Sequence, residues 1–285
     1  MTTWTRATLF GERFTHRPVE EFFQRRGRVR WQRRNPYRKE PLEAVRAEIM
    51  RGRKWRYHHG IDGLAETSGF YRAHAGRVDS MLEMLDGALG AAGIDLPGAS
   101  ILDVAAAEGY AANHLIDRGA TDVDVVELNE GNLQRIWQIR ALQQQASIGR
   151  VGRLDVERAD WARALGRTYD VVLALGIVYH MENPMLWLRN LYAATKSVAV
   201  VESDTPIYPR NARFRGYGVT YLHRDQVTLS ANNVRYITEF RPDRQALAEM
   251  LLAAGFQRVD EVAPATLTPC RYFDDGEKSM LIAFR

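Results

Sequence analysis

The sequence predicts an α/β fold in which a mainly parallel seven-stranded sheet is covered by helices on both faces. From residue 99 onward, short apolar runs alternate with amphipathic stretches, which is typical of a sheet built from strand–helix units. Two strands expected near the C-terminus, QRVDEV and KSMLIAFR, follow each other without a helix between them. These two observations indicate a parallel sheet that ends in an antiparallel hairpin at one edge.

The expected strands and helices from residue 99 onward can each be assigned to a stretch of the sequence. The first five expected strands are short apolar runs suited to burial on both faces of a sheet: SILDVA, DVDVVEL, GRVGRLD, YDVVLALGIVY and SVAVVES. The helices expected after them are EGYAANHLIDRG, NEGNLQRIWQIRALQQQ, DWARALG, NPMLWLRNLYAAT and PDRQALAEMLLAAGF. Asn129 can cap the second of these helices, and Pro184 suits the first turn of the fourth.

The region before the alternating pattern is expected to form a basic, helical N-terminal cap over residues 1–95, with the main domain over residues 96–285. Helical pieces are predicted within residues 18–57, a loop over 58–69 and a helix over 70–92. The apolar face of this last helix consists of Val78, Met81, Leu82, Leu85 and Leu89.

Residues 203–241 interrupt the alternation with an aromatic, polar stretch that is too long for an ordinary connection. The stretch leaves the carboxyl end of the fifth strand, and ligands of open α/β sheets bind at that edge. We therefore interpret it as an insertion that helps to form a substrate pocket. Arg213, Arg215 and Arg235 could bind a substrate carboxylate or phosphate, or they could be solvated loop residues.

Charge and cysteine content narrow the class of protein. Residues 1–59 contain 16 Lys and Arg against 6 Asp and Glu, whereas the rest of the chain contains 23 against 29. The basic segment indicates either a solvated helical surface packed on the acidic main domain or contact with an anionic partner. Cys270 is the only cysteine, which excludes an intramolecular disulfide and fits a cytoplasmic protein. Neither a secretion signal nor a membrane span is expected.

The first strand-to-helix turn, ILDVAAAEGY, is built from small residues. Such residues let backbone amides approach a ligand closely, with the N-terminus of the next helix behind them. Glu127 ends the second strand 24 residues after Asp103, where a carboxylate can accept both hydroxyls of a ribose. Asp155 ends the third strand, where a carboxylate can receive an adenine amino group. The pattern predicts a nucleoside-binding site.

This set of residues resembles the class I methyltransferases that use S-adenosyl-L-methionine. Their first motif is D-x-G-x-G-x-G, and here Asp103, Ala105, Ala107 and Gly109 occupy its positions. The resemblance implies a Rossmann-like fold. It also implies a cofactor site formed by Asp103, Ala105, Ala107, Gly109, Tyr110, Glu127, Asp155 and Gly176. Because alanine disfavours positive φ, the two alanines predict a less extreme turn or weaker cofactor binding.

After the fourth strand, LGIVYHMENPMLWLRNL resembles the G-V-L-Y-H-x-x-x-P-x-x-x-L motif of the tRNA wobble-uridine carboxymethyltransferase-like group and of its small-molecule relatives. The matching residues are Gly176, Tyr179, His180, Pro184 and Leu188. Upstream, KWRYHHGIDGLAETSG is similar to that group's W-x-x-x-I-x-x-G-x-x-T-x-G stretch, which lies over the cofactor. The corresponding residues are Lys54, Trp55, Ile61, Thr67 and Gly69. Whether the cofactor is carboxylated stays open.

The candidate catalytic residues follow from the chemistry of methyl transfer, an in-line displacement in which a hydroxyl or ammonium acceptor also loses a proton. His180 is the first candidate base, because an imidazole with a pKa of about 6.5 suits that step; the alternative is that it anchors its loop. Tyr179 is expected to contact the methionine part of the cofactor or the acceptor. His58 or His59 could also face the pocket.

A metal site is a weaker alternative. It would combine two histidines with one carboxylate, drawn from His58, His59, His223, Asp62, Asp225 and Glu202. Because the spacing of these residues is not diagnostic of such a site, no metal is predicted.

The acceptor is expected to be a small molecule, which could be anionic, that is methylated at O, N or C in a pocket lidded by the cap and the insertion. The second hypothesis is a tRNA-modifying enzyme, with the basic N-terminal segment gripping phosphates. A non-catalytic nucleoside-binding scaffold is a third. A dinucleotide-dependent oxidoreductase would need a closer match to G-x-G-x-x-G. A homodimer is compatible with a lidded pocket, and no membrane partner is expected.

Overall fold

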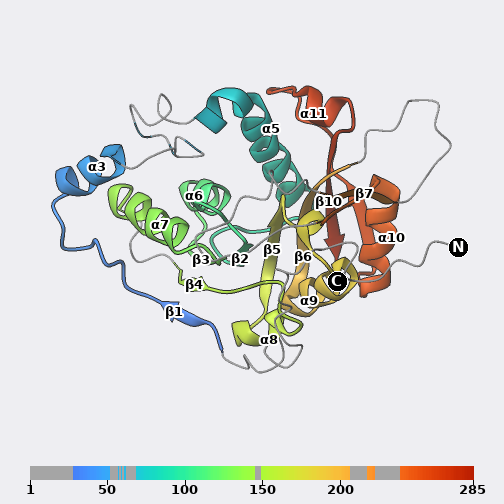
Figure 1. Cartoon of the computed structure of the whole chain (residues 1–285), viewed down its shortest axis with the longest axis horizontal. Coiled ribbons are helices and arrows are strands. Elements are labelled where there is room, and N and C mark those ends of the chain that lie inside the picture. The colour runs from blue at the N-terminus through green and yellow to red at the C-terminus, as the bar shows by residue number, and fades with distance from the viewer. Residues whose placement is uncertain are drawn as a thin grey trace, which may run out of the picture.

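The computed structural model describes residues 28–51, 57, 59, 61, 69–144, 149–205, 217–221 and 238–285. Within these residues an eight-stranded sheet has the order β1-β4-β3-β2-β5-β6-β10-β9, and β7 and β8 form a separate two-stranded sheet (Figure 1). The strands are β1 (Arg30–Gln32), β2 (Ser100–Val104), β3 (Asp122–Glu127), β4 (Val151–Arg153), β5 (Tyr169–Leu175), β6 (Thr195–Asp204), β7 (Tyr217–Tyr221), β8 (Thr238–Pro242), β9 (Arg258–Glu261) and β10 (Lys278–Phe284).

The centre of the sheet is parallel, as the alternating pattern predicts. Strands β4, β3, β2, β5 and β6 run in one direction, and β10 pairs antiparallel with both β6 and β9. The antiparallel pair near the C-terminus is therefore confirmed. The expectation that no helix lies between its two strands is wrong, because the short helix α11 (Arg271–Asp274) lies there.

The predicted count of seven strands is wrong because β1 forms within a stretch that was expected to be helical. β1 pairs antiparallel with β4, with Trp31 opposite Gly152. A Cβ at Gly152 would lie 2.4 Å from Val29 Cγ1 and 2.8 Å from Trp31 Cε3, so the bare glycine lets these side chains pack onto β4. The Arg150 guanidinium lies 4.2 Å from the centroid of the Trp31 ring. These tertiary contacts override the local helical pattern.

Helices cover both faces of the sheet. They are α3 (Leu42–Arg51), α5 (Gly69–Ala91), α6 (Tyr110–Asp117), α7 (Glu130–Leu142), α8 (Trp161–Leu165), α9 (Pro184–Ala194) and α10 (Arg244–Ala254), with a 3-10 turn, η1 (Val178–His180), after β5. Apolar residues of α8, α9 and α10 pack on one face of the sheet, and those of α5, α6, α7 and α11 pack on the other.

The long helix α5 takes part in the main core. Of its predicted apolar face, Val78, Leu82, Leu85 and Leu89 are buried and Met81 is half-buried. Helix α3 packs on α7 through a smaller cluster that includes Val45, Ile49 and Ile139. The proposed boundary between a cap and a main domain stays a prediction.

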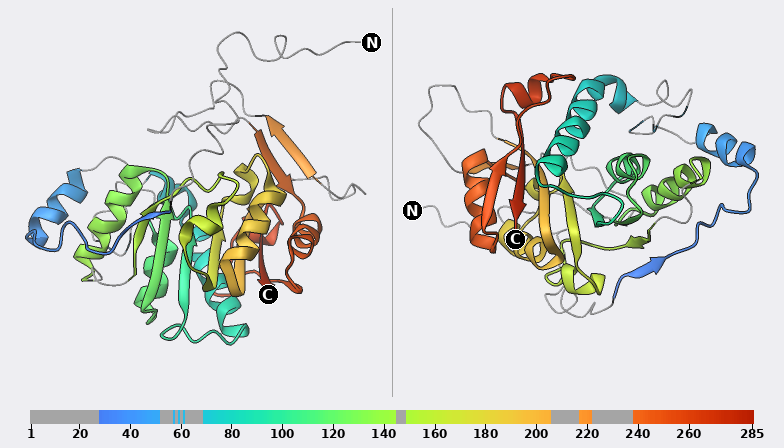
Figure 2. Two further views of the ribbon diagram at one scale, coloured as in Figure 1. Left: turned by 90° about the horizontal axis from the view of Figure 1, so that it is seen from below. Right: turned by 180° about the vertical axis from the view of Figure 1, so that it is seen from behind.

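The expected insertion contains a pair of antiparallel strands that the sequence pattern does not predict. Strands β7 and β8 pair antiparallel, and they project beyond one end of the main sheet (Figure 2). β8 packs against η1 and β6. Residues 206–216 and 222–237 lie outside the described part of the chain. None of the described helices is long and apolar enough to cross a membrane.

Candidate functional site

The turn between β2 and α6 has a strongly bent backbone. Ala105, Ala107 and Gly109 have φ values of 55°, 51° and 73°. Of the two consequences expected from the alanines, the less extreme turn is therefore wrong, and weaker cofactor binding stays a prediction. A left-handed alanine costs roughly 1–2 kcal/mol, so the surrounding structure must hold these two residues in place.

Glu127, at the end of β3, supplies part of that support. Its Oε2 accepts a hydrogen bond from the Ala107 N–H at 2.8 Å. Its Oε1 accepts from the N–H groups of Leu128 at 2.8 Å and Asn129 at 2.9 Å. The carboxylate that the sequence assigns to ribose binding thus also joins the bent turn to the end of the neighbouring strand.

Asp103 connects β2 to the first turn of α6. The carboxylate is buried, and its Oδ2 accepts a hydrogen bond from the Ala112 N–H at 3.2 Å. Burial, with a further contribution from the charge of Glu127, raises the pKa of Asp103 to about 7. The Ala112 N–H and the buried Arg140 act in the opposite direction. Burial also lowers the pKa of Arg140 to about 10.

Asp155 follows β4 at the same edge of the sheet, and its Oδ1 accepts a hydrogen bond from the Glu157 N–H at 3.1 Å. Burial, together with the charges of Glu182 and Asp155, raises the pKa of Glu157 to about 7. Glu157 is not among the site residues predicted from the sequence. A carboxylate two residues beyond Asp155, in a loop that leaves the ligand-binding edge, is the signal that could have revealed it.

The described residues of the upstream segment lie against the same turn. The Tyr57 ring stacks on Tyr110, with centroids 4.8 Å apart and planes 6° from parallel. The buried Glu108 carboxylate accepts hydrogen bonds from the Tyr57 N–H at 3.2 Å and from Arg135 at 2.5 Å. His59 lies edge-on to Tyr110, and its Nε2 is 3.8 Å from Glu108 Oε2. These contacts cover the turn from outside the sheet.

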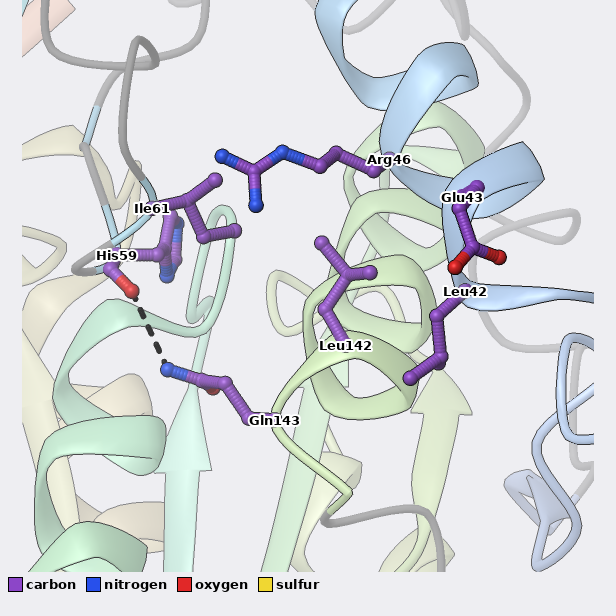
Figure 3. A pocket seen from close by; sticks show the side chains of 7 residues that line it. All are labelled: Leu42, Glu43, Arg46, His59, Ile61, Leu142 and Gln143. Carbon is purple, nitrogen blue, oxygen red and sulfur yellow. Dashed lines mark hydrogen bonds between the residues drawn. The ribbon is translucent and has the colours of Figure 1, made fainter.

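A pocket of about 400 Å³ opens beside this segment. Its lining residues are Leu42, Glu43, Arg46, His59, Ile61, Leu142 and Gln143. Figure 3 shows Arg46 reaching across from α3 toward Ile61, and Gln143 donating a hydrogen bond to the His59 carbonyl at 3.2 Å. His59 therefore lies on the side of α3 and α7. A catalytic role for it stays a prediction, and His58, Lys54, Trp55 and Thr67 lie outside the described residues.

Tyr179 and His180 lie on η1, directly beyond the end of β5, with ring centroids 4.2 Å apart. Tyr179 is buried and His180 is half-buried. Gly176 precedes them with a φ of 72°, and its N–H donates to the Glu202 carbonyl at 3.0 Å. A Cβ at Gly176 would lie 3.3 Å from Glu202 Oε2 and 3.6 Å from the Tyr179 hydroxyl, so glycine lets both polar groups approach this turn.

A group of charged side chains, which we call the β6 charge cluster, lies around the carboxyl end of β6. It consists of Arg77, Glu202, Asp204, Arg241 and Lys278. The side chains of Glu202 and Lys278 are only 1% and 5% exposed, and Lys278 Nζ lies 5.5 Å from the centroid of the Tyr179 ring. The cluster therefore shares the end of β6 with η1.

The sequence pattern indicates Glu202 only as a candidate metal ligand and does not indicate Lys278. Lys278 reaches this edge because β10 is antiparallel to β6, so the start of β10 lies beside the end of β6, with Lys278 opposite Asp204. A lysine that opens an otherwise apolar strand is the signal that could have revealed it.

The metal alternative finds no support within the described residues, where no group of three His, Cys, Asp or Glu side chains could hold an ion. His58, His223, Asp62 and Asp225 lie outside those residues, as do Arg213, Arg215 and Arg235.

Solved structures similar to this chain include several methyltransferases. The N-terminal domain of EvdMO1, crystallised in the presence of SAH (S-adenosylhomocysteine) and D-fucose, matches with a TM-score of 0.60 and 18% identity over 88% of this chain and 99% of that chain. Magnesium protoporphyrin IX methyltransferase from Synechocystis PCC 6803 with bound SAH matches with a TM-score of 0.50 and 14% identity over 88% and 97%.

A S-adenosylmethionine-dependent methyltransferase from Clostridium acetobutylicum ATCC 824 matches with a TM-score of 0.50 and 11% identity over 72% of this chain and 91% of that chain. At these identities the likeness shows the fold. No curated protein matches the sequence. The model of a methyltransferase domain family matches residues 78–261, and the chain belongs to that family.

Proposed function

We propose that this protein transfers a methyl group from S-adenosylmethionine to a small-molecule acceptor. The observation that carries the proposal is the order of side chains along one edge of the sheet. The bent turn after Asp103, Glu127 and Asp155 follow three neighbouring parallel strands, and Tyr179 and His180 follow the next strand. Similar solved structures with bound SAM or SAH support the choice of cofactor.

The residues at this edge fit an adenosine-containing cofactor. Glu127 would accept hydrogen bonds from the ribose hydroxyls, and Asp155 would receive the adenine amino group. The residues with positive φ in the turn present backbone amides near the N-terminus of α6, where a carboxylate of the ligand is favoured. Tyr110 and Gly176 are the remaining residues that would contact the cofactor.

When bound, the cofactor supplies an electrophilic methyl group on a sulfonium. An O–H or N–H acceptor of this methyl group would have to release a proton. His180 would take that proton, because it lies at the end of β5 and remains partly exposed beside Tyr179. Tyr179 would position the acceptor or the methionine part of the cofactor.

The cofactor assignment is tested by calorimetry with S-adenosylhomocysteine on the wild type and on Glu127→Ala. We expect at least a 10-fold loss of affinity, because the variant loses hydrogen bonds to a charged acceptor. Glu130→Ala is the matched control, since it removes the same charge from an exposed side chain three residues away. Unchanged binding by Glu127→Ala, in a protein whose melting temperature shows that it is folded, would contradict the assignment.

A tRNA acceptor is the second candidate, and exposed basic residues favour it. Arg28, Arg30, Arg33, Arg34, Arg38 and Lys39 are all exposed on and around β1. β1 and β6 lie at positions one and six of the sheet, so the spacing of neighbouring strands puts their backbones roughly 24 Å apart. A small acceptor bound at β6 is too short to reach the basic residues around β1, whereas a tRNA could contact both regions.

A further inference from the structure

The β6 charge cluster contains more cations than carboxylates among the residues that the structure describes. Lys278 Nζ is 2.8 Å from Glu202 Oε1, and Lys278 also forms a close ion pair with Asp204. Arg241 approaches Asp204 from β8, with 3.8 Å between Nη2 and Oδ2. Three cations against two carboxylates leave these five side chains with a formal net charge of +1.

Among the described residues, Arg77 forms one long ion pair, with Glu202. It lies on α5, and its side chain is 21% exposed. Its Nη2 is 3.9 Å from Glu202 Oε1, which is longer than a hydrogen bond, and no hydrogen bond joins Arg77 to a described residue. A guanidinium carries five N–H donors, and donors that are largely withdrawn from water usually have acceptors. This side chain therefore has donors to offer to a ligand.

We propose that Arg77 binds a carboxylate in the methyl-transfer site, an inference that rests on the function proposed above. A guanidinium matches the two oxygens of a carboxylate through paired N–H donors. Glu202 Oε2 and the Tyr179 hydroxyl both lie beside Gly176, so Arg77 reaches the same strand end as η1. The carboxylate belongs either to the amino-acid part of the cofactor or to the acceptor.

The other members of the cluster explain why a second carboxylate is tolerated beside Glu202. A buried carboxylate without a counter-ion would repel an anionic ligand. Here Lys278 compensates Glu202 at contact distance, and it holds Asp204 as well. Lys278 is therefore engaged by the protein's own carboxylates, and Arg77 is the cation that can receive an incoming one.

Calorimetry with two cofactor-like probes tests the proposal. S-Adenosylhomocysteine carries the amino-acid carboxylate, whereas methylthioadenosine lacks the whole amino-acid part. Both are titrated into the wild type, Arg77→Gln and Arg77→Lys. Arg163→Gln, which removes one charge from an exposed position on α8, is the matched control.

If Arg77 binds the cofactor, Arg77→Gln weakens S-adenosylhomocysteine binding by about 10- to 100-fold and leaves methylthioadenosine binding unchanged. Arg77→Lys keeps the charge but not the paired donors, so its affinity for S-adenosylhomocysteine lies between those of the wild type and Arg77→Gln. The control binds both probes as the wild type does.

If Arg77 binds the acceptor, Arg77→Gln leaves S-adenosylhomocysteine binding unchanged. Succinate then binds to the wild-type protein saturated with S-adenosylhomocysteine, and Arg77→Gln weakens that binding at least 10-fold. The proposal is overturned if Arg77→Gln, shown by its melting temperature to be folded, alters neither measurement, or if it weakens both cofactor probes equally. Failure of the wild type to bind S-adenosylhomocysteine would instead contradict the proposed function.

Discussion

At the scale of single residues, Asp103 couples the stability of the fold to pH. Its pKa in the folded protein is about 7, above its ordinary value of 3.8, because the carboxylate is buried. The stabilisation associated with the protonated form is therefore fully present below about pH 4 and is lost as the pH rises through 7. A neutral side chain at this position should not lose stability in this way as the pH rises.

We therefore expect the free energy of unfolding of Asp103→Asn, relative to that of the wild type, to increase between pH 4 and pH 7 and then to level off. Chemical denaturation at several pH values measures this difference. Any change in the hydrogen bond from Ala112 adds an offset that is the same at every pH. A difference that stays constant across this range would show that Asp103 is ionised in the folded protein well below pH 7.

The alanines of the turn show where reasoning from residue type fails. The positions of Asp103, Ala105, Ala107 and Gly109 could be predicted from the sequence, and the backbone at Ala105 and Ala107 could not. The preference of alanine against positive φ is weaker than the combined effect of the hydrogen bonds that hold the turn, including the one from Ala107 to Glu127. Those hydrogen bonds depend on a strand that is adjacent only in the fold.

At the scale of elements, local signals predicted what depends on local interactions. Asn129 Oδ1 accepts from the Asn132 N–H at 3.1 Å and caps α7, and Pro184 opens α9 behind its cap Asn183. Both predictions are confirmed. β1 was missed because a three-residue strand has almost no periodicity, and its partner β4 lies more than 100 residues away in the chain.

The packing of β1 on Gly152 predicts that a methyl group at position 152 destabilises the fold. A Cβ would lie 2.4 Å from Val29 Cγ1, so Gly152→Ala must displace β1, and we expect a loss of about 1–3 kcal/mol in the free energy of unfolding. Gly87→Ala is the control, because this exposed glycine in α5 has nothing within 4 Å of a Cβ. The control should gain about 0.5–1 kcal/mol, since alanine favours a helix.

Chemical denaturation of both variants measures these changes. Equal stability of Gly152→Ala and the wild type would mean that β1 is not packed on β4 in solution.

At the scale of the whole molecule, the distribution of charge separates the two candidate acceptors. If the exposed basic residues around β1 grip RNA, binding of a tRNA should weaken steeply as salt rises from 50 to 200 mM, by about 10³-fold or more for six phosphate contacts. Fluorescence anisotropy with labelled tRNA measures this. Absence of binding at low salt would remove the tRNA hypothesis, and it would leave the small-molecule proposal in place.

The general architecture could be predicted from the sequence because alternating strands and helices constrain a parallel sheet strongly. The β6 charge cluster could not, because it joins α5, β6, β8 and β10, whose neighbourhood depends on the topology. The acceptor pocket depends in addition on residues 203–241, most of which lie outside the described part of the chain.

The short strand β1 also affects how copies of this protein could associate. It occupies one edge of the sheet, and β9 occupies the other. Arg30 and Gln32 of β1 are exposed, as are Arg258, Asp260 and Glu261 of β9. Short edge strands with charged side chains resist pairing with a strand of another chain. A homodimer, if it forms, should therefore use the faces of helices or the β7–β8 pair, and not a sheet continued from one subunit into the next.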